Sequence, residues 1–210
     1  MSGKSAVARK KHDIDGDALP EWFGVDVEDL SARLRFNPKD AHIWLGDERM
    51  MLMHVDAFAV VRQEIIDGLG LDEARRIFTR IGATAGARDA EIARKASPHA
   101  GPLEAFKAGP RLHAIEGVCA PDELKLQVDT DAGLLNGEWI WRNSAEAEAH
   151  VRAMGPSAEP ICWMMLGYAS AYSSAFMGHG IVFREVECRA MGAPHCRTIG
   201  KPAALWEEQE

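Results

Sequence analysis

Cysteine is scarce in this sequence, with only four among 210 residues. Four cysteines are too few for a scaffold held together by disulfides, and the chain begins without the basic and apolar segments of a secretory signal. Its longest apolar runs, such as residues 161–166, fall far short of the roughly 20 residues that cross a bilayer. We therefore expect a cytoplasmic protein without a membrane crossing.

Positive charge is also in short supply. The chain has 24 Lys and Arg against 32 Asp and Glu, a net charge of −8, and the first eleven residues hold four bases and no acid. The rest of the chain is therefore more acidic still, and its overall field does not favour nucleic acid. Phosphate-binding loops and the GxSxG, HExxH and GxGxxG motifs are absent, so no common enzyme signature is present.

The composition, with 47% hydrophobic and 27% charged residues, is that of a folded globular protein with one large core. Residues 1–18 are polar and basic, and we expect a flexible terminus there. An arm over about 19–40 carries apolar residues between Trp22 and Phe36, which suit an interface because a lone arm cannot bury them.

Hydrophobic periodicity predicts helices and strands in separate blocks. Residues 48–69 and a stretch starting near Asp72 and ending at Ser97-Pro98 read as helices. The second should bury Ala74, Ile77, Phe78, Ile81 and Ala85, and small residues at 82–87 should let another backbone approach. A hairpin is predicted at 123–129 and 134–141, helices at 144–153 and 161–177, and strands at 181–188 and 196–200. The fold class is therefore α+β, with antiparallel strands packed against helices.

Three of the four cysteines fall close together near the C-terminal end, at Cys162, Cys188 and Cys196. Thiolates suit zinc, which binds four ligands in a tetrahedron. Glu185, His195 and His179 are the candidates for the fourth ligand, and spacing does not choose among them. The alternative is that the cysteines are buried as small hydrophobic residues, because no CxxC motif occurs.

A second group of candidates is aromatic. Trp139 and Trp141 share one face of a strand, Tyr168 and Tyr172 share one face of a helix, and His113 lies in an apolar stretch. The imidazole and the indole N–H could together hold one phenolic oxygen inside an apolar pocket. The alternative is an ordinary core with a hydrogen-bonded histidine, since aromatic residues at regular spacing usually pack together.

Four separated motifs resemble the N-terminal sensor domain of XylR/DmpR/MopR-type activators of aromatic catabolism. They are IWLGDERMMLMH (43–54), AGPRLHAIEG (108–117), PICWMMLGYASAYSSAFMG (160–178) and FREVECRAMGAPHCRTIGKPAALW (183–206). The resemblance covers about 34–206, and its C-terminal half is similar to a vinyl-reductase-type ligand domain. It implies a single zinc-stapled sensor domain over 19–206, with its ligand-binding part at about 100–206 and a linker starting at 207–210.

By this resemblance one structural Zn²⁺ per chain is held by Cys162, Glu185, Cys188 and Cys196. Phenol sensors of the family hold the effector hydroxyl with a histidine and a tryptophan, which correspond to His113 and Trp141. Toluene-type members have tyrosine at the histidine position. The aromatic walls implied by the same likeness are Phe106, Trp139, Tyr168, Tyr172 and Phe183, of which Trp139 and Phe183 depart from the phenylalanine and tyrosine of a close phenol sensor.

The resemblance also implies a function without catalysis in this chain. We expect a homodimeric regulatory domain that binds a phenol-like effector and thereby relieves repression of an AAA+ ATPase in a sigma-54-dependent activator. It would contact neither nucleic acid nor membrane. Alternatives are a sensor for alkylbenzenes or hydroxybiphenyl and, as a different class, a zinc enzyme acting on aromatic or tetrapyrrole substrates. A catalytic zinc keeps an open position, whereas three cysteines and a glutamate fill the tetrahedron.

Overall fold

A computed structural model of the chain describes residues 27–96, 98–99 and 101–207. The flexible basic terminus predicted for 1–18, the first part of the arm and the linker at 208–210 lie outside these residues. None of the helices in the described ranges combines the length and the apolar character that a bilayer crossing needs.

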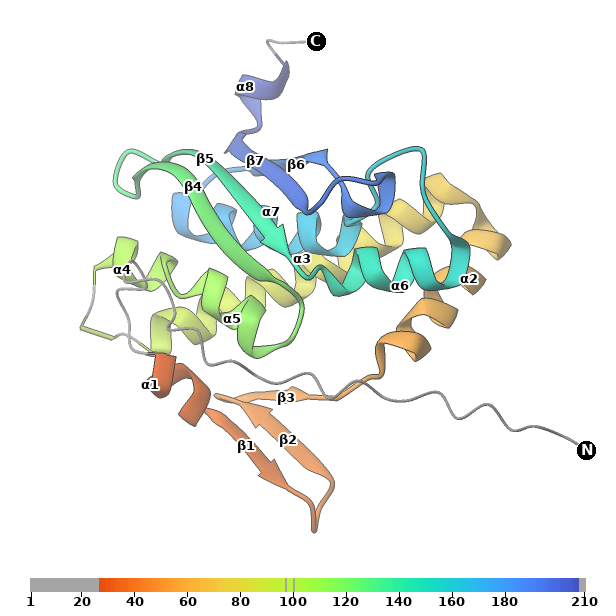
Figure 1. Cartoon of the computed structure of the whole chain (residues 1–210). Helices are drawn as coiled ribbons and strands as arrows, with labels where there is room; N and C mark the ends of the chain where they lie inside the picture. The colour runs from red at the N-terminus through yellow and green to blue at the C-terminus, as the bar shows by residue number, and fades with distance from the viewer. Residues whose placement is uncertain (1–26, 97, 100, 208–210) are drawn as a thin grey trace, which may run out of the picture.

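Helices and antiparallel strands form separate blocks, which confirms the α+β class (Figure 1). The first block contains α1 (Val27–Ala32), β1 (Leu34–Asn37), β2 (His42–Leu45), β3 (Glu48–Met50), α2 (Val55–Leu69), α3 (Leu71–Ala96), α4 (Pro102–Phe106) and α5 (Gly109–Ile115). The second contains β4 (Ala120–Asp129), β5 (Leu134–Arg142), α6 (Ala145–Met154), α7 (Trp163–Met177), β6 (Ile181–Glu187), a 3₁₀ turn (Arg189–Met191), β7 (Cys196–Pro202) and α8 (Ala204–Glu207).

Two antiparallel sheets are present in the described part of the chain. The larger has the strand order β4-β5-β7-β6, and α7 lies across it, with α3 on the far side of α7 (Figure 1). The smaller sheet, β1-β2-β3, projects away from it at the bottom of the view. On β5 the residues at 135, 137, 139 and 141 are buried, so the predicted inward face is confirmed.

The long helices α3 and α7 pack unusually closely because glycines lie at their crossing. A Cβ atom on Gly82 would come within 1.8 Å of the Met164 carbonyl oxygen, and one on Gly86 within 2.3 Å of the Tyr168 carbonyl oxygen. The prediction that small residues at 82–87 admit another backbone is therefore confirmed. The buried face predicted for α3 is partly wrong, because Ile81 is 48% exposed and the glycines take the inward positions.

The helix predicted at 48–69 is correct only from Val55 onward. Residues Glu48–Met50 form β3, which pairs with β2, and Met51 is 75% exposed. The pairing with β2 overrides the helical spacing of the apolar residues here. In contrast, the predicted cap at Ser144 is confirmed, since its hydroxyl accepts a hydrogen bond from the Ala147 N–H.

Candidate functional site

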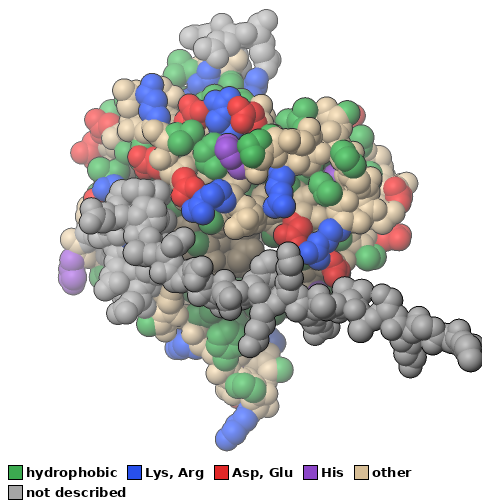
Figure 2. Space-filling view, in the orientation of Figure 1, with side chains coloured by type: hydrophobic (Ala, Val, Ile, Leu, Met, Phe, Trp, Pro, Cys, Tyr) green, Lys and Arg blue, Asp and Glu red, His purple; other side chains and the backbone are tan. Residues whose placement is uncertain are grey.

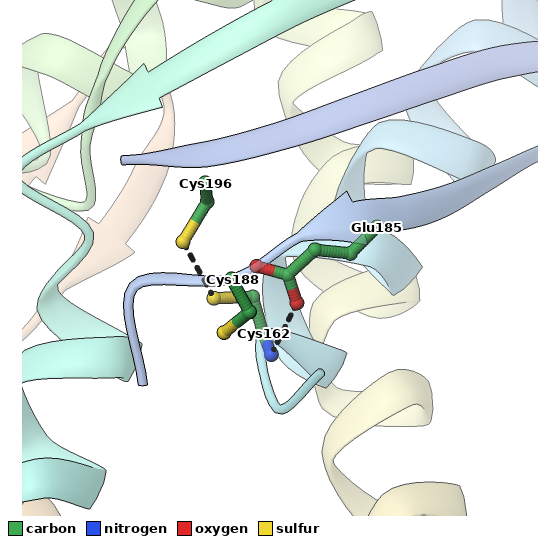
Figure 3. A group of neighbouring side chains, drawn as sticks. All are labelled: Cys162, Glu185, Cys188 and Cys196. Atoms are coloured by element: carbon green, nitrogen blue, oxygen red, sulfur yellow. Dashed lines mark hydrogen bonds between the residues drawn. The ribbon is translucent and has the colours of Figure 1, made fainter. Parts of the chain in front are cut away.

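The three clustered cysteines and Glu185 meet in space, although they come from separate elements. Cys162 directly precedes α7, Glu185 lies on β6, Cys188 follows β6, and Cys196 begins β7. All four are buried, and one potential ligand atom from each lies within 4.8 Å of the others. Figure 3 shows the three sulfur atoms and the carboxylate gathered around one point. This group could hold a metal ion.

The polar atoms of the cluster fit a cation. Glu185 Oε2 accepts a hydrogen bond from the Cys162 N–H at 3.1 Å, whereas its Oε1 is buried and has no hydrogen-bond partner. Burial raises the pKa of the Glu185 carboxyl to about 8, so the site disfavours a carboxylate without a compensating charge. A divalent cation coordinated by Oε1 and the thiolates would supply that charge. Among the described residues, His179 and His195 do not belong to the group.

A buried ion pair holds the segment that carries Cys162, and the sequence analysis missed it. Arg62 on α2 donates to Glu146 Oε1 and to the Ile161 carbonyl oxygen, each at 2.7 Å. Glu146 also accepts the N–H groups of Met164 and Met165 at the start of α7. The position of Arg62 on the apolar face of α2, one turn from Ile66, is the signal that could have revealed it.

The second site is a cavity of about 710 Å³ between α4, α5, α7 and the sheet. Its walls are mostly apolar and aromatic, as in most sites for small organic molecules. The seven ligand-contact candidates of the sequence analysis all line it: Phe106, His113, Trp139, Trp141, Tyr168, Tyr172 and Phe183. The fold thus brings together residues that are up to 77 positions apart in the chain, from Phe106 to Phe183.

His113 is the distinctive polar residue of this cavity. It is 5% exposed, and neither ring nitrogen has a hydrogen-bond partner. Burial lowers the pKa of its imidazole to about 3, so the ring is neutral at physiological pH and offers one donor and one acceptor nitrogen. Its ring centroid lies 3.9 Å from that of Tyr168 and 6.3 Å from that of Trp141. An unpartnered buried imidazole is costly unless a ligand uses it.

The two tyrosines of the cavity differ from His113 because their hydroxyls are already bonded to protein atoms. The Tyr168 hydroxyl donates to Asp89 Oδ2 at 2.5 Å. The Tyr172 hydroxyl lies 3.1 Å from the Ala105 carbonyl oxygen and 2.9 Å from that of Phe106. Both residues therefore present their rings to the cavity, with their polar ends held elsewhere.

Glycines on the sheet make room for the aromatic wall. A Cβ atom on Gly137 would come within 2.1 Å of the Trp139 ring, and one on Gly200 within 2.4 Å of the Phe183 ring. The two rings lie over these glycines, 5.2 Å apart. Trp139 and Phe183 thus form one wall, and a change at either residue alters the shape of the same part of the cavity.

Comparison with known proteins decides the family. Residues 29–129 match the XylR N-terminal family, described as an activator of aromatic catabolism, and residues 141–202 match the vinyl-reductase-type ligand domain. A crystal structure described as the phenol-responsive sensory domain of the transcription activator PoxR with phenol superposes with a TM-score of 0.84 at 42% identity, covering 87% of this chain and 90% of that one. The chain belongs to the XylR-type sensor-domain family.

Two curated relatives of this sensor domain are longer regulators. The phenol regulator MopR of Acinetobacter guillouiae is 40% identical over 88% of this chain, and the transcriptional regulatory protein XylR of Pseudomonas putida is 40% identical over 89%. The chain spans 33% of the length of each. Membership of a family of regulatory sensor domains confirms the resemblance and the prediction that this chain is regulatory and not an enzyme.

Proposed function

We propose that this chain is the effector-binding domain of an activator of aromatic catabolism and that its effector is phenol or a similar hydroxylated aromatic. The observation that carries the proposal is His113, a neutral imidazole with two unpartnered nitrogens in an otherwise apolar cavity. A phenolic hydroxyl both donates and accepts, so it can bond to this ring while its aromatic carbon atoms contact the walls. The names of the MopR and PoxR relatives support the same ligand class.

In this proposal His113 and Trp141 hold the hydroxyl together. The indole N–H of Trp141 is a donor only, so it suits the phenolic oxygen and leaves the phenolic proton for an imidazole nitrogen. Closing the cavity around the ligand removes water and strengthens both bonds. The aromatic walls are the remaining five contacts: Phe106, Trp139, Tyr168, Tyr172 and Phe183.

We propose zinc as the metal of the cysteine cluster, one ion per chain, with a structural role. Three thiolates and one carboxylate match a closed tetrahedral zinc site and leave no open position for catalysis. The bound ion would tie the start of α7 to β6 and β7, three elements that frame the cavity. Its binding energy would therefore count as folding energy.

Effector binding would act on domains beyond this chain, in the cytoplasm. The names of the longer relatives support a transcriptional activator, and we propose a sigma-54-dependent one whose AAA+ ATPase is repressed by this domain. An effector changes such an equilibrium only through different affinities for the repressing and released states. We expect the chain itself to make no contact with nucleic acid.

The size of the cavity keeps a second effector class open. Its volume of about 710 Å³ lies in the usual range for drug-sized ligands and exceeds the space that one phenol ring needs. Hydroxybiphenyl would also place a hydroxyl on His113 while its second ring fills the remaining space. An alkylbenzene would fill the walls and leave the imidazole without a partner.

Calorimetric titration with phenol, toluene, catechol and 2-hydroxybiphenyl tests the proposal. We expect phenol to bind more tightly than toluene by about tenfold or more, the effect of one satisfied buried hydrogen bond. Equal affinities for phenol and toluene, or no binding of any hydroxylated ring, would contradict it. A preference for 2-hydroxybiphenyl over phenol would support the second effector class.

We also propose that two copies of the chain associate through the smaller sheet and its flank. Phe36, Met51, Leu52 and Met53 are each at least half exposed, and Figure 2 shows hydrophobic side chains over this lower part of the molecule. In the predicted arm, Leu30 is already fully buried within its own chain, so it does not contribute free surface. A contiguous exposed apolar surface favours a protein partner.

Replacing Met51, Leu52 and Met53 together by serine should convert the dimer to a monomer at micromolar concentration. The substitution removes apolar area that only association would bury. Light scattering measures the mass of each form. Leu124→Ser, which removes an apolar side chain 55% exposed on the distant strand β4, is the matched control and should stay dimeric. A monomeric parent chain would refute the proposal.

A further inference from the structure

Two carboxyl groups are buried behind His113, outside the cavity. Asp89 lies on α3 and is 4% exposed, and Glu116 ends helix α5 three residues after His113. Neither residue lines the cavity. Asp89 accepts the Tyr168 hydroxyl at 2.5 Å, and a further hydrogen bond joins its carboxyl to that of Glu116. These three residues, which we call the carboxyl clamp, tie α3, α5 and α7 to one another.

A hydrogen bond between two carboxyl groups requires a proton on one of them. Burial raises the pKa of Asp89 to about 6, and burial together with the charge of Asp89 raises that of Glu116 to about 8. At pH 7 the pair therefore holds one proton and one negative charge, as two close carboxyls usually do. The remaining charged or titratable groups that influence the pair are Glu48, which also disfavours charge on Asp89, and the Tyr168 hydroxyl.

The clamp bears on the cavity through Tyr168 and through helix α5. The Tyr168 ring packs on His113 with 3.9 Å between ring centroids, and its hydroxyl is held only on the Asp89 side. His113 has no hydrogen bond of its own, so packing and the helix backbone alone fix its ring. A clamp that fixes both Tyr168 and the end of α5 therefore fixes the imidazole from two directions.

We propose that Asp89 and Glu116 are positioning residues for effector recognition, which hold Tyr168 and the end of α5 so that the His113 imidazole faces the effector hydroxyl. This inference rests on the proposed function, because it assigns the clamp to the phenol contact made by His113. The clamp touches no ligand itself. It acts through residues that line the cavity.

The shared proton makes the clamp sensitive to pH. A carboxyl whose pKa is raised by the folded arrangement loses the stabilising proton as the pH rises through that raised value. Above pH 8 both carboxyls of the clamp are charged and repel each other, so the arrangement that holds His113 is disfavoured. Between pH 7 and pH 9 the affinity for phenol should fall by about tenfold, since pH 9 is one unit above the pKa of Glu116. Phenolic hydroxyls ionise near pH 10, so most of the ligand stays neutral.

The test is a set of phenol titrations at pH 7 and pH 9 by calorimetry, on the whole chain with its metal bound. Glu116→Gln keeps a permanent donor toward Asp89 and should bind phenol at pH 7 within about twofold of the parent, but without the loss at pH 9. Asp89→Ala removes the acceptor of the Tyr168 hydroxyl and should weaken binding by about tenfold at pH 7. Glu91→Gln, an exposed acid on the same helix, is the matched control and should keep the parental profile.

A double-mutant cycle with Tyr168→Phe separates positioning from general stability. If Asp89 acts through the Tyr168 hydroxyl, Tyr168→Phe should lose as much affinity as Asp89→Ala, and the double variant should lose little more. Additive losses, or a loss at pH 9 that persists in Glu116→Gln, would overturn the inference while phenol binding by the parent still supports the proposed function. Absence of phenol binding by the parent at either pH would overturn both.

Discussion

Replacing Cys188 by alanine should lower the free energy of unfolding by more than about 3 kcal/mol, which is roughly 6–12 °C in melting temperature for a domain of this size. The unfolded chain has no preformed metal site, so any energy of metal binding stabilises the folded state directly. Loss of one thiolate leaves an incomplete set of ligands in a buried place where Glu185 Oε1 has no other partner. Metal analysis should find about one zinc in the parent and a reduced content in the variant.

Cys119→Ala is the matched control for the metal prediction. Cys119 is also a buried cysteine, at 4% exposure, but it lies outside the cluster. Its replacement should cost about 1 kcal/mol through lost packing and leave the zinc content unchanged. Equal melting temperatures for the parent and Cys188→Ala, or a folded parent with far less than one zinc per chain, would rule out a structural zinc.

His113→Ala should weaken phenol binding by about tenfold to hundredfold and toluene binding much less. The variant leaves the phenolic hydroxyl buried without its partner, a cost of about 1 to 3 kcal/mol, whereas toluene has no polar group to lose. His113→Tyr should shift the preference away from hydroxylated rings, in keeping with the tyrosine of toluene-type relatives. Calorimetric titration of both variants with both ligands measures the change in preference.

Each His113 variant must first retain its melting temperature and its metal. The opposing hypothesis, that His113 is only a core residue, predicts a general loss of stability and equal losses for phenol and toluene. In that case the hydroxylated effector class would have no support from this residue. The structure already argues against an ordinary core histidine, because neither nitrogen has found a protein partner.

Much of the local structure could be predicted because it depends on short-range patterns. The alternation in β5 revealed the inward face that carries Trp139 and Trp141, and the cap at Ser144 fixed the start of α6. The three cysteines stood out because they are few and close in sequence. Spacing left the fourth member open, and the folded chain places Glu185 in the group while His179 lies against the Gly133 carbonyl oxygen.

The features that sequence did not reveal depend on contacts between distant segments. The ion pair of Arg62 with Glu146 joins positions 84 residues apart, and the Tyr168 bond to Asp89 joins positions 79 apart. A polar residue on an apolar face looks like an interruption until its partner is placed. Likewise, Glu48–Met50 read as helix because their pairing with β2 is invisible to periodicity.

The central claim is that the cavity holds a hydroxylated ring by its oxygen, and a crystal structure of the chain with phenol tests it most directly. We predict the phenolic oxygen within about 3.2 Å of an imidazole nitrogen of His113 and of the Trp141 indole nitrogen, with the ring between Phe106, Tyr172 and the Trp139–Phe183 wall. A ring bound elsewhere, or one in the cavity with its oxygen turned away from His113, would contradict the account.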